Sequence, residues 1–147
     1  MRAQQWTPPA YARIAIRGLS AATCRDIARA ELRDDHPFLW RGGTALALHG
    51  LGKFLARPGR YLYLRRSLCT AGACELIDDV AHARDYLAMI LPVLPLRSRR
   101  ELGRMLAGLD KEILRRTIPD PFPPEGTWRV LQGLCGWEWW HRRIYEG

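Results

Sequence analysis

Lysine is almost absent from this chain. Only Lys53 and Lys111 are lysine, although the 147 residues hold 23 Lys+Arg against 15 Asp+Glu, a formal net charge of +8. Because genomes rich in G and C encode arginine readily, the total charge alone is weak evidence for an anionic partner. With 48% apolar and 26% charged residues, the composition excludes a disordered chain, a collagen-like repeat and a coiled-coil rod.

Long apolar runs are also lacking. The longest covers residues 87–96 and is interrupted by Pro92 and Pro95, whereas a membrane span needs roughly 18 residues. The first residues show no apolar segment of a signal peptide, so we expect a cytoplasmic protein. Its cysteines are then expected to be reduced or metal-bound.

The spacing of apolar residues predicts a mainly α protein, a small single-domain fold of four to five helices with at most a two-stranded β-ribbon. We expect one domain over residues 1–147, with an N-terminal arm at 1–11 and a Pro-rich linker at 118–126 before a Trp-rich C-terminal segment. A chain of this length buries roughly two-thirds of its unfolded surface, so it folds without disulfides or metals.

Capping residues and glycines place the expected helices. The first helix follows Ser20, and the fourth follows Ser98, which with Glu101 has the spacing of a capping box. The second and third cover 44–56 and 75–91, and an interrupted fifth begins at Trp128. Gly50 and Gly52 weaken the second helix by about 1 kcal/mol each relative to alanine. Residues 13–17 and 60–66 alternate as short strands and are expected to pair.

Acidic residues are missing from residues 36–74. This segment nevertheless holds six bases, Arg41, Lys53, Arg57, Arg60, Arg65 and Arg66, while the rest of the chain has 17 bases and 15 acids. Tyr61 and Tyr63 lie between these bases, a combination that suits a phosphate backbone with stackable nucleobases. The alternative is a solvated face whose acidic partners come from elsewhere in the chain.

Within this segment, Arg41-Gly42-Gly43 precedes a helix. Glycines there let an anion approach the backbone, and free N–H groups with the helix dipole bind it. Arg41 can add a bidentate contact. The alternative is a tight turn with Thr44 as the N-cap.

Residues 42–49, which begin Gly42-Gly43-Thr44, resemble the Gly-Gly-Thr/Ser opening of minimal nucleotidyltransferases. The resemblance implies two-metal nucleotidyl transfer, for which that family follows the motif with an Asp-x-Asp pair. Here no acid follows before Glu75, and two-metal chemistry needs carboxylates. A small enzyme or degenerate nucleotidyltransferase-like protein is therefore the third hypothesis for function.

A metal site is suggested by Cys69 and Cys74, with His82 downstream and Cys135 or His141 as a fourth ligand. Zinc takes tetrahedral Cys and His ligands, but small buried cysteines are the default. No cofactor is therefore expected, with a structural zinc ion as the alternative.

The third and fourth helices each present a charged face. Asp78, His82 and Asp85 share one face of the third helix, which suits either acid–base chemistry or a salt-linked surface. The fourth helix carries bases opposite its apolar stripe: Arg99, Arg100, Arg104, Lys111, Arg115 and Arg116. That helix either binds a groove or forms a solvated outer face.

The C-terminal segment is rich in tryptophan and arginine. These residue types dominate the energetic centres of protein interfaces, and the candidates are Trp137, Trp139, Trp140, Arg142 and Arg143. The alternative is a segment folded over the core.

Taken together, the sequence favours a non-enzymatic binding protein. Its partner would be a second copy or an acidic protein, contacted through the basic 41–66 surface and the Trp/Arg tail. The alternative is a nucleic-acid-binding accessory protein that uses the acid-free segment 36–74.

Overall fold

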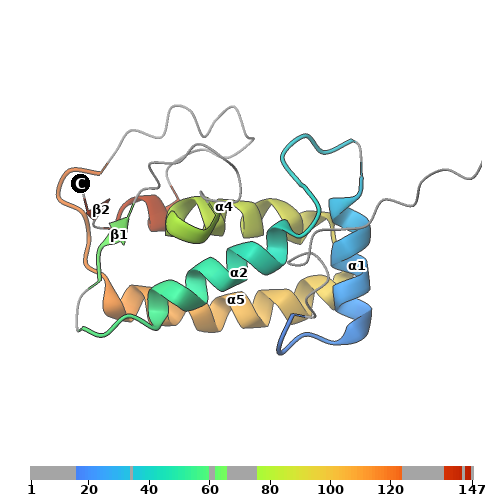
Figure 1. Cartoon of the computed structure of the whole chain (residues 1–147), viewed down its shortest axis with the longest axis horizontal. Helices are drawn as coiled ribbons and strands as arrows, with labels where there is room; N and C mark the ends of the chain where they lie inside the picture. The colour runs from blue at the N-terminus through green and yellow to red at the C-terminus, as the bar shows by residue number, and fades with distance from the viewer. Residues whose placement is uncertain are drawn as a thin grey trace, which may run out of the picture.

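The chain is mainly helical, as the sequence predicts (Figure 1). The computed structural model describes residues 16–33, 35–59, 62–65, 76–123, 138–143 and 145–146. The α-helices of this part are α1 (Ala21–Glu31), α2 (Gly43–Leu55), α4 (Val80–Ile90) and α5 (Leu96–Arg116). Two short 3₁₀ helices, η2 (Leu91–Val93) and η4 (Trp139–His141), follow α4 and begin the C-terminal segment.

The helices enclose one apolar core. α4 turns back through η2 into the antiparallel α5, α2 packs mainly on α4, and α1 stands across the first turns of α5 (Figure 1). The predicted apolar stripes supply this core, with fully buried side chains that include Leu51, Leu87, Ile90, Leu102 and Ile113.

The first helix begins as predicted, but the predicted capping box of α5 is wrong. Ser20 caps α1 and accepts a hydrogen bond from the Thr23 N–H. α5 starts two residues before Ser98, after Pro95, whose ring presets a φ suited to a helix start. Glu101 instead reaches α1, where it accepts hydrogen bonds from the Ser20 backbone and from the Thr23 hydroxyl at 2.6 Å.

The predicted continuous helix over 75–91 is interrupted. Residues 76–78 are helical, but Asp79 has an extended backbone and begins α4 by accepting a hydrogen bond from the His82 N–H at 3.0 Å. An aspartate side chain that bonds to nearby backbone N–H groups favours a new helix start over continuation.

The strand pairing also differs from the expectation. β1 (Leu64–Arg65) pairs in parallel with β2 (Tyr145–Glu146), rather than with residues 13–17. Residues 13–15 lie outside the described part, and Ile16 and Arg17 are not in a strand. Pro119 in the Pro-rich linker bridges Arg143. The C-terminal segment is therefore held by both β1 and the linker.

Two glycines allow α2 to lie close to its neighbours. A Cβ atom on Gly50 would sit 2.2 Å from the Leu76 carbonyl oxygen, and one on Gly43 would sit 2.2 Å from the Tyr86 ring. Gly50 reduces helix propensity, as the sequence indicates, but both glycines permit a packing distance that no larger residue allows.

Candidate functional site

The N-terminus of α2 already binds a carboxylate from the same chain. Glu31, at the end of α1, is buried and accepts hydrogen bonds from the N–H groups of Gly42 and Thr44, at 3.1 and 2.7 Å. The Thr44 hydroxyl donates at 2.9 Å and the Tyr86 hydroxyl at 2.5 Å. Gly42 permits this geometry because its φ of 84° is accessible mainly to glycine.

Burial is the main cause of the shifted pKa of both Glu31 and Tyr86. Desolvation raises the pKa of Glu31 above its ordinary value, although its four hydrogen bonds act in the opposite direction. Desolvation and the adjacent Glu31 raise the pKa of Tyr86 as well. Tyr86 therefore stays a hydroxyl, whose single proton lies between two acceptors, the Glu31 carboxylate at 2.5 Å and the Trp40 carbonyl at 2.8 Å.

This network bears directly on the anion site expected at Arg41, Gly42 and Gly43. The backbone donors at the start of α2 are those that an external phosphate would need. In the structure, Glu31 accepts their hydrogen bonds, and Arg41 is half-buried. An internal anion therefore stands where the sequence suggests an external one.

The other bases of the acid-free segment do not gather on one described surface. Lys53 forms an ion pair with Asp78 at 3.6 Å, and Arg57 is half-buried. Arg41 lies before the opposite end of α2, about 18 Å from Lys53 along the helix axis. Arg60, Arg66 and the side chain of Arg65 lie outside the described residues.

The C-terminal aromatic residues pack inward where the structure describes them. Trp140 and His141 are buried, and Trp139 packs partly buried against the core. Arg143 donates to the Thr117 hydroxyl at 2.7 Å, while Arg142 is exposed. Trp137 lies outside the described residues. Trp140 is thus an internal packing residue, because its ring fills space beside α4.

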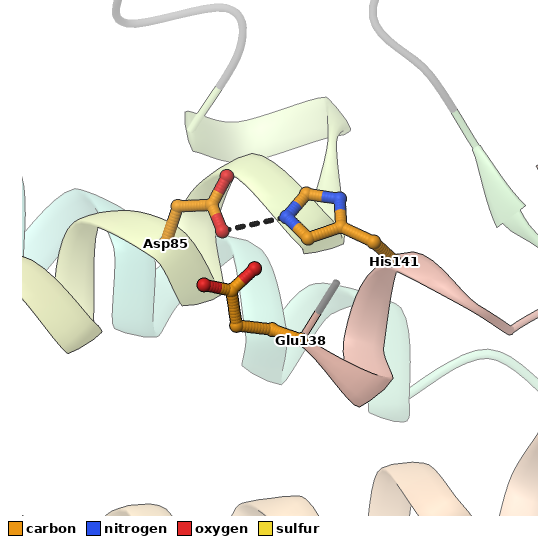
Figure 2. Close-up of side chains that lie close together, drawn as sticks. All are labelled: Asp85, Glu138 and His141. Carbon is orange, nitrogen blue, oxygen red and sulfur yellow. Dashed lines mark hydrogen bonds and ion pairs between the residues drawn. The ribbon is translucent and has the colours of Figure 1, made fainter. Parts of the chain in front are cut away.

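Figure 2 shows a buried cluster of acidic and imidazole groups between α4 and η4. His141 Nε2 lies 2.7 Å from Asp85 Oδ1, which also accepts a hydrogen bond from Trp140 Nε1 at 2.8 Å. Asp85 is fully buried, so its predicted place on a salt-linked surface face is wrong, whereas Asp78 is exposed and pairs with Lys53. The Glu138 carboxylate points into the same space from the start of η4.

The Arg84 guanidinium borders this cluster. It forms a bidentate ion pair with Asp110, at 2.8 and 3.0 Å, and lies 4.4 Å from the centre of the Trp140 ring. Arg84 therefore connects α4, α5 and the C-terminal segment, and its charge is balanced by Asp110.

This cluster shares only His141 with the metal ligands that the sequence suggests. Cys69, Cys74 and Cys135 lie outside the described residues, and His82 is half-buried near the start of α4. Sequence reasoning missed the association of Asp85 with His141 because 56 residues separate them. The contact depends on how the C-terminal segment folds back, for which the sequence carries no local pattern.

The outer face of α5 is basic. Arg97, Arg100, Arg104 and Lys111 are exposed and occupy about 60° of the helix circumference over about 21 Å. Among the described residues, none of these four forms an ion pair. They are called the α5 basic stripe below. Figure 1 shows α5 along one long edge of the molecule.

The acidic residues of α5 face other parts of the chain or another arginine. Glu101 binds the start of α1, Asp110 binds Arg84, and Glu112 pairs with Arg115 at 2.8 Å. Arg99 and Arg116, which the sequence grouped with the outer bases, donate to backbone carbonyls instead. Among the described residues, the exposed bases of α5 that bind neither a carbonyl nor an acid are therefore a narrower set, which includes Arg97.

Comparison of the chain with protein-family models, curated proteins and solved structures finds no match. No helix in the described ranges is long and apolar enough to cross a membrane.

Proposed function

We propose that the protein binds nucleic acid and that the α5 basic stripe contacts the phosphates of a duplex. The observation that carries this proposal is the alignment of four exposed bases on one helix face with no acid among them. Phosphate contacts of this kind supply most of the affinity of sequence-independent binding.

The shape of the surface around the stripe favours the binding of a polyanion. Leu96, Arg97, Arg100 and Arg104 line a shallow surface depression of about 700 Å³. Ala107 and Gly108 border the stripe on its two sides, and the methyl group of one and the lack of a side chain in the other leave room for a backbone to approach. The net charge of +8 adds long-range attraction toward any polyanion.

A protein partner fits this face less well. The exposed leucines that flank the stripe, Leu96 and Leu114, are about 27 Å apart along the helix. A protein interface needs a contiguous apolar centre surrounded by polar residues, and these two side chains are too far apart to supply one.

The test measures the binding of a labelled duplex of roughly 20 base pairs by fluorescence anisotropy at low salt. A triple variant, Arg97→Gln, Arg100→Gln and Arg104→Gln, is expected to bind about tenfold or more weakly. The matched control removes the same charge from α1 through substitution of Arg25, Arg29 and Arg33, which are also exposed. Equal losses in both triple variants would overturn the role of the stripe.

Polyglutamate of matched length serves as a competitor in the same assay. Displacement of the duplex by excess DNA but not by polyglutamate supports a nucleic-acid partner. Equal displacement by both at equal charge would instead indicate an acidic protein and would reject the proposal.

A further inference from the structure

We propose that the protein associates with a second copy of itself, and that Phe122 of one copy inserts into an apolar hollow between α2 and α5 of the other. Phe122 is 88% exposed, the largest exposed fraction among the large apolar side chains that the structure describes. The contact involves neither the α5 basic stripe nor a duplex, so it stands or falls independently of the proposed function.

The chain holds Phe122 in a defined place outside the core. Asp120 accepts a hydrogen bond from the Phe122 N–H at 2.9 Å, and its own N–H donates to the Arg142 carbonyl at 2.8 Å. Pro121 and Pro123 restrict the backbone on both sides of the ring. An aromatic ring on a restrained backbone loses little conformational entropy when a partner buries it. Phe122 therefore has the properties of an anchor residue at a protein interface.

A hollow in the surface between α2 and α5 has room for this ring. Its volume is about 420 Å³, within the range of roughly 300–1,000 Å³ that is typical of binding pockets. The apolar residues that line it are Ile16, Ala45, Leu48, Met105 and Leu109. All five are half-buried, so part of their apolar surface remains in contact with water. A ring that fills the hollow removes this surface from water, which favours association.

The charges beside the two surfaces are complementary. Arg17 and His49 border the hollow, and within the described part of the chain neither forms a hydrogen bond or an ion pair. Asp120 lies two residues before Phe122 and, among the same residues, forms no ion pair either. Because Asp120 and Phe122 belong to one turn, insertion of the ring brings the carboxylate toward the two bases. This pairing favours one orientation of the inserted segment.

Phe122 does not reach the hollow of its own chain. Met105 precedes Arg116, the last residue of α5, by about 17 Å along the helix axis, and Phe122 follows that end. The bridge between Pro119 and Arg143 holds the segment there (Figure 1). A second copy therefore supplies the ring. Because two different surfaces meet, the contact either closes reciprocally between two copies or continues into a larger assembly.

Sedimentation of the full chain at concentrations up to about 1 mM tests this association. A salt concentration of about 0.15 M screens the repulsion between copies of net charge +8. The wild type is expected to associate reversibly, and Phe122→Ala to associate at least about tenfold more weakly. Leu32→Ala removes an exposed apolar side chain elsewhere and should leave association unchanged. A wild type that stays monomeric, or Phe122→Ala that associates like the wild type, would overturn the proposal.

Variants of both surfaces test the pairing itself. Ala45→Trp fills the hollow and is expected to prevent association, as Phe122→Ala does. An equimolar mixture of the two variants retains one intact ring and one intact hollow, so the mixture should associate although each variant alone is monomeric. Asp120→Asn keeps an acceptor for the Phe122 N–H but removes the charge, and it should weaken association less than Phe122→Ala. A mixture that stays monomeric, with both variants folded by circular dichroism, would contradict the pairing.

A peptide probes the hollow of the wild type without a variant of the protein. The probe is a synthetic peptide with the sequence of residues 118–124, followed by NMR of the methionine methyl groups. The peptide is expected to shift the Met105 methyl resonance and to leave that of the buried Met89 in place. The same peptide with Phe122→Ala should cause no shift. No response at Met105, or equal responses to the two peptides, would overturn the proposal.

Discussion

Replacement of Glu31 by alanine tests whether this buried carboxylate replaces an external anion at the start of α2. The change removes the acceptor of four hydrogen bonds that join α1, α2 and α4. It leaves the backbone of Gly42 and Thr44 in place, so the donors of the proposed internal anion site remain. The variant therefore separates the loss of the carboxylate from damage to the loop.

The cost follows from the donors that lose their partner. Tyr86 keeps the Trp40 carbonyl as an acceptor, so the loss falls on the buried N–H groups of Gly42 and Thr44 and on the Thr44 hydroxyl. Each unsatisfied buried donor costs about 1–3 kcal/mol, and removal of a desolvated charge offsets part of this. A net loss of about 3 kcal/mol is expected, which lowers the Tm of a chain of this size by roughly 6–12 °C.

Thermal unfolding followed by circular dichroism supplies the assay. Acetate is expected to raise the Tm of Glu31→Ala more than that of the wild type, because it can occupy the vacated carboxylate position. Chloride at equal ionic strength controls for screening, and Glu112→Ala controls for loss of an exposed carboxylate. A Tm within 2 °C of the wild type, or no specific acetate effect, would refute the reasoning.

Three further predictions concern stability. Gly50→Ala is expected to lower the midpoint of urea unfolding, because the added methyl group would meet a backbone carbonyl. Gly52→Ala has open space around the added methyl group and should raise the free energy of unfolding by about 1 kcal/mol. Equal effects of the two substitutions would contradict the close packing at Gly50. Burial raises the pKa of Glu31 in the folded protein, so protonation of this carboxyl group stabilises the fold. This stabilisation is fully present below the ordinary carboxyl pKa and is lost as the pH rises through the raised pKa of the folded state. The Tm gap between wild type and Glu31→Ala should therefore widen as the pH falls toward about 4, and a narrowing gap would oppose this. The hydrogen bond from Thr23 lowers the pKa of Glu101, so its contribution is present above the ordinary carboxyl pKa and is lost in acid. The Tm deficit of Glu101→Gln should accordingly shrink at low pH, and a constant deficit would count against it.

Local patterns in the sequence account for most of the helical fold. The i, i+4, i+11 spacing of Leu102, Leu106 and Ile113 predicts the buried face of α5, and Ser20 predicts the start of α1. These features depend on residues within one or two turns of each other, so periodicity and capping rules are sufficient to find them.

Contacts between distant residues could not be predicted in this way. Glu101 has the local spacing of a capping box, yet it binds the start of α1. Glu31 occurs in the sequence as one more helical glutamate, but it fills the anion position that Gly42 and Gly43 suggest. Asp85 was expected on the surface because its partner His141 is known only once the chain has folded.

The α5 basic stripe illustrates the same limit. The sequence identifies the helix and several of its bases, but it gives no means to separate Arg100 and Arg104 from Arg99 and Arg116. The last two donate to backbone carbonyls at helix ends. Only the packing of α5 decides which bases are bound by the rest of the chain.

The salt dependence of duplex binding tests the proposed function most directly. If the α5 basic stripe contacts phosphates, the slope of log Kobs against log salt should become shallower by about 2.7 when Arg97, Arg100 and Arg104 are replaced by glutamine, since each contact contributes about 0.9. The control triple variant at Arg25, Arg29 and Arg33 should retain the wild-type slope. Identical slopes for all three proteins would contradict the proposal.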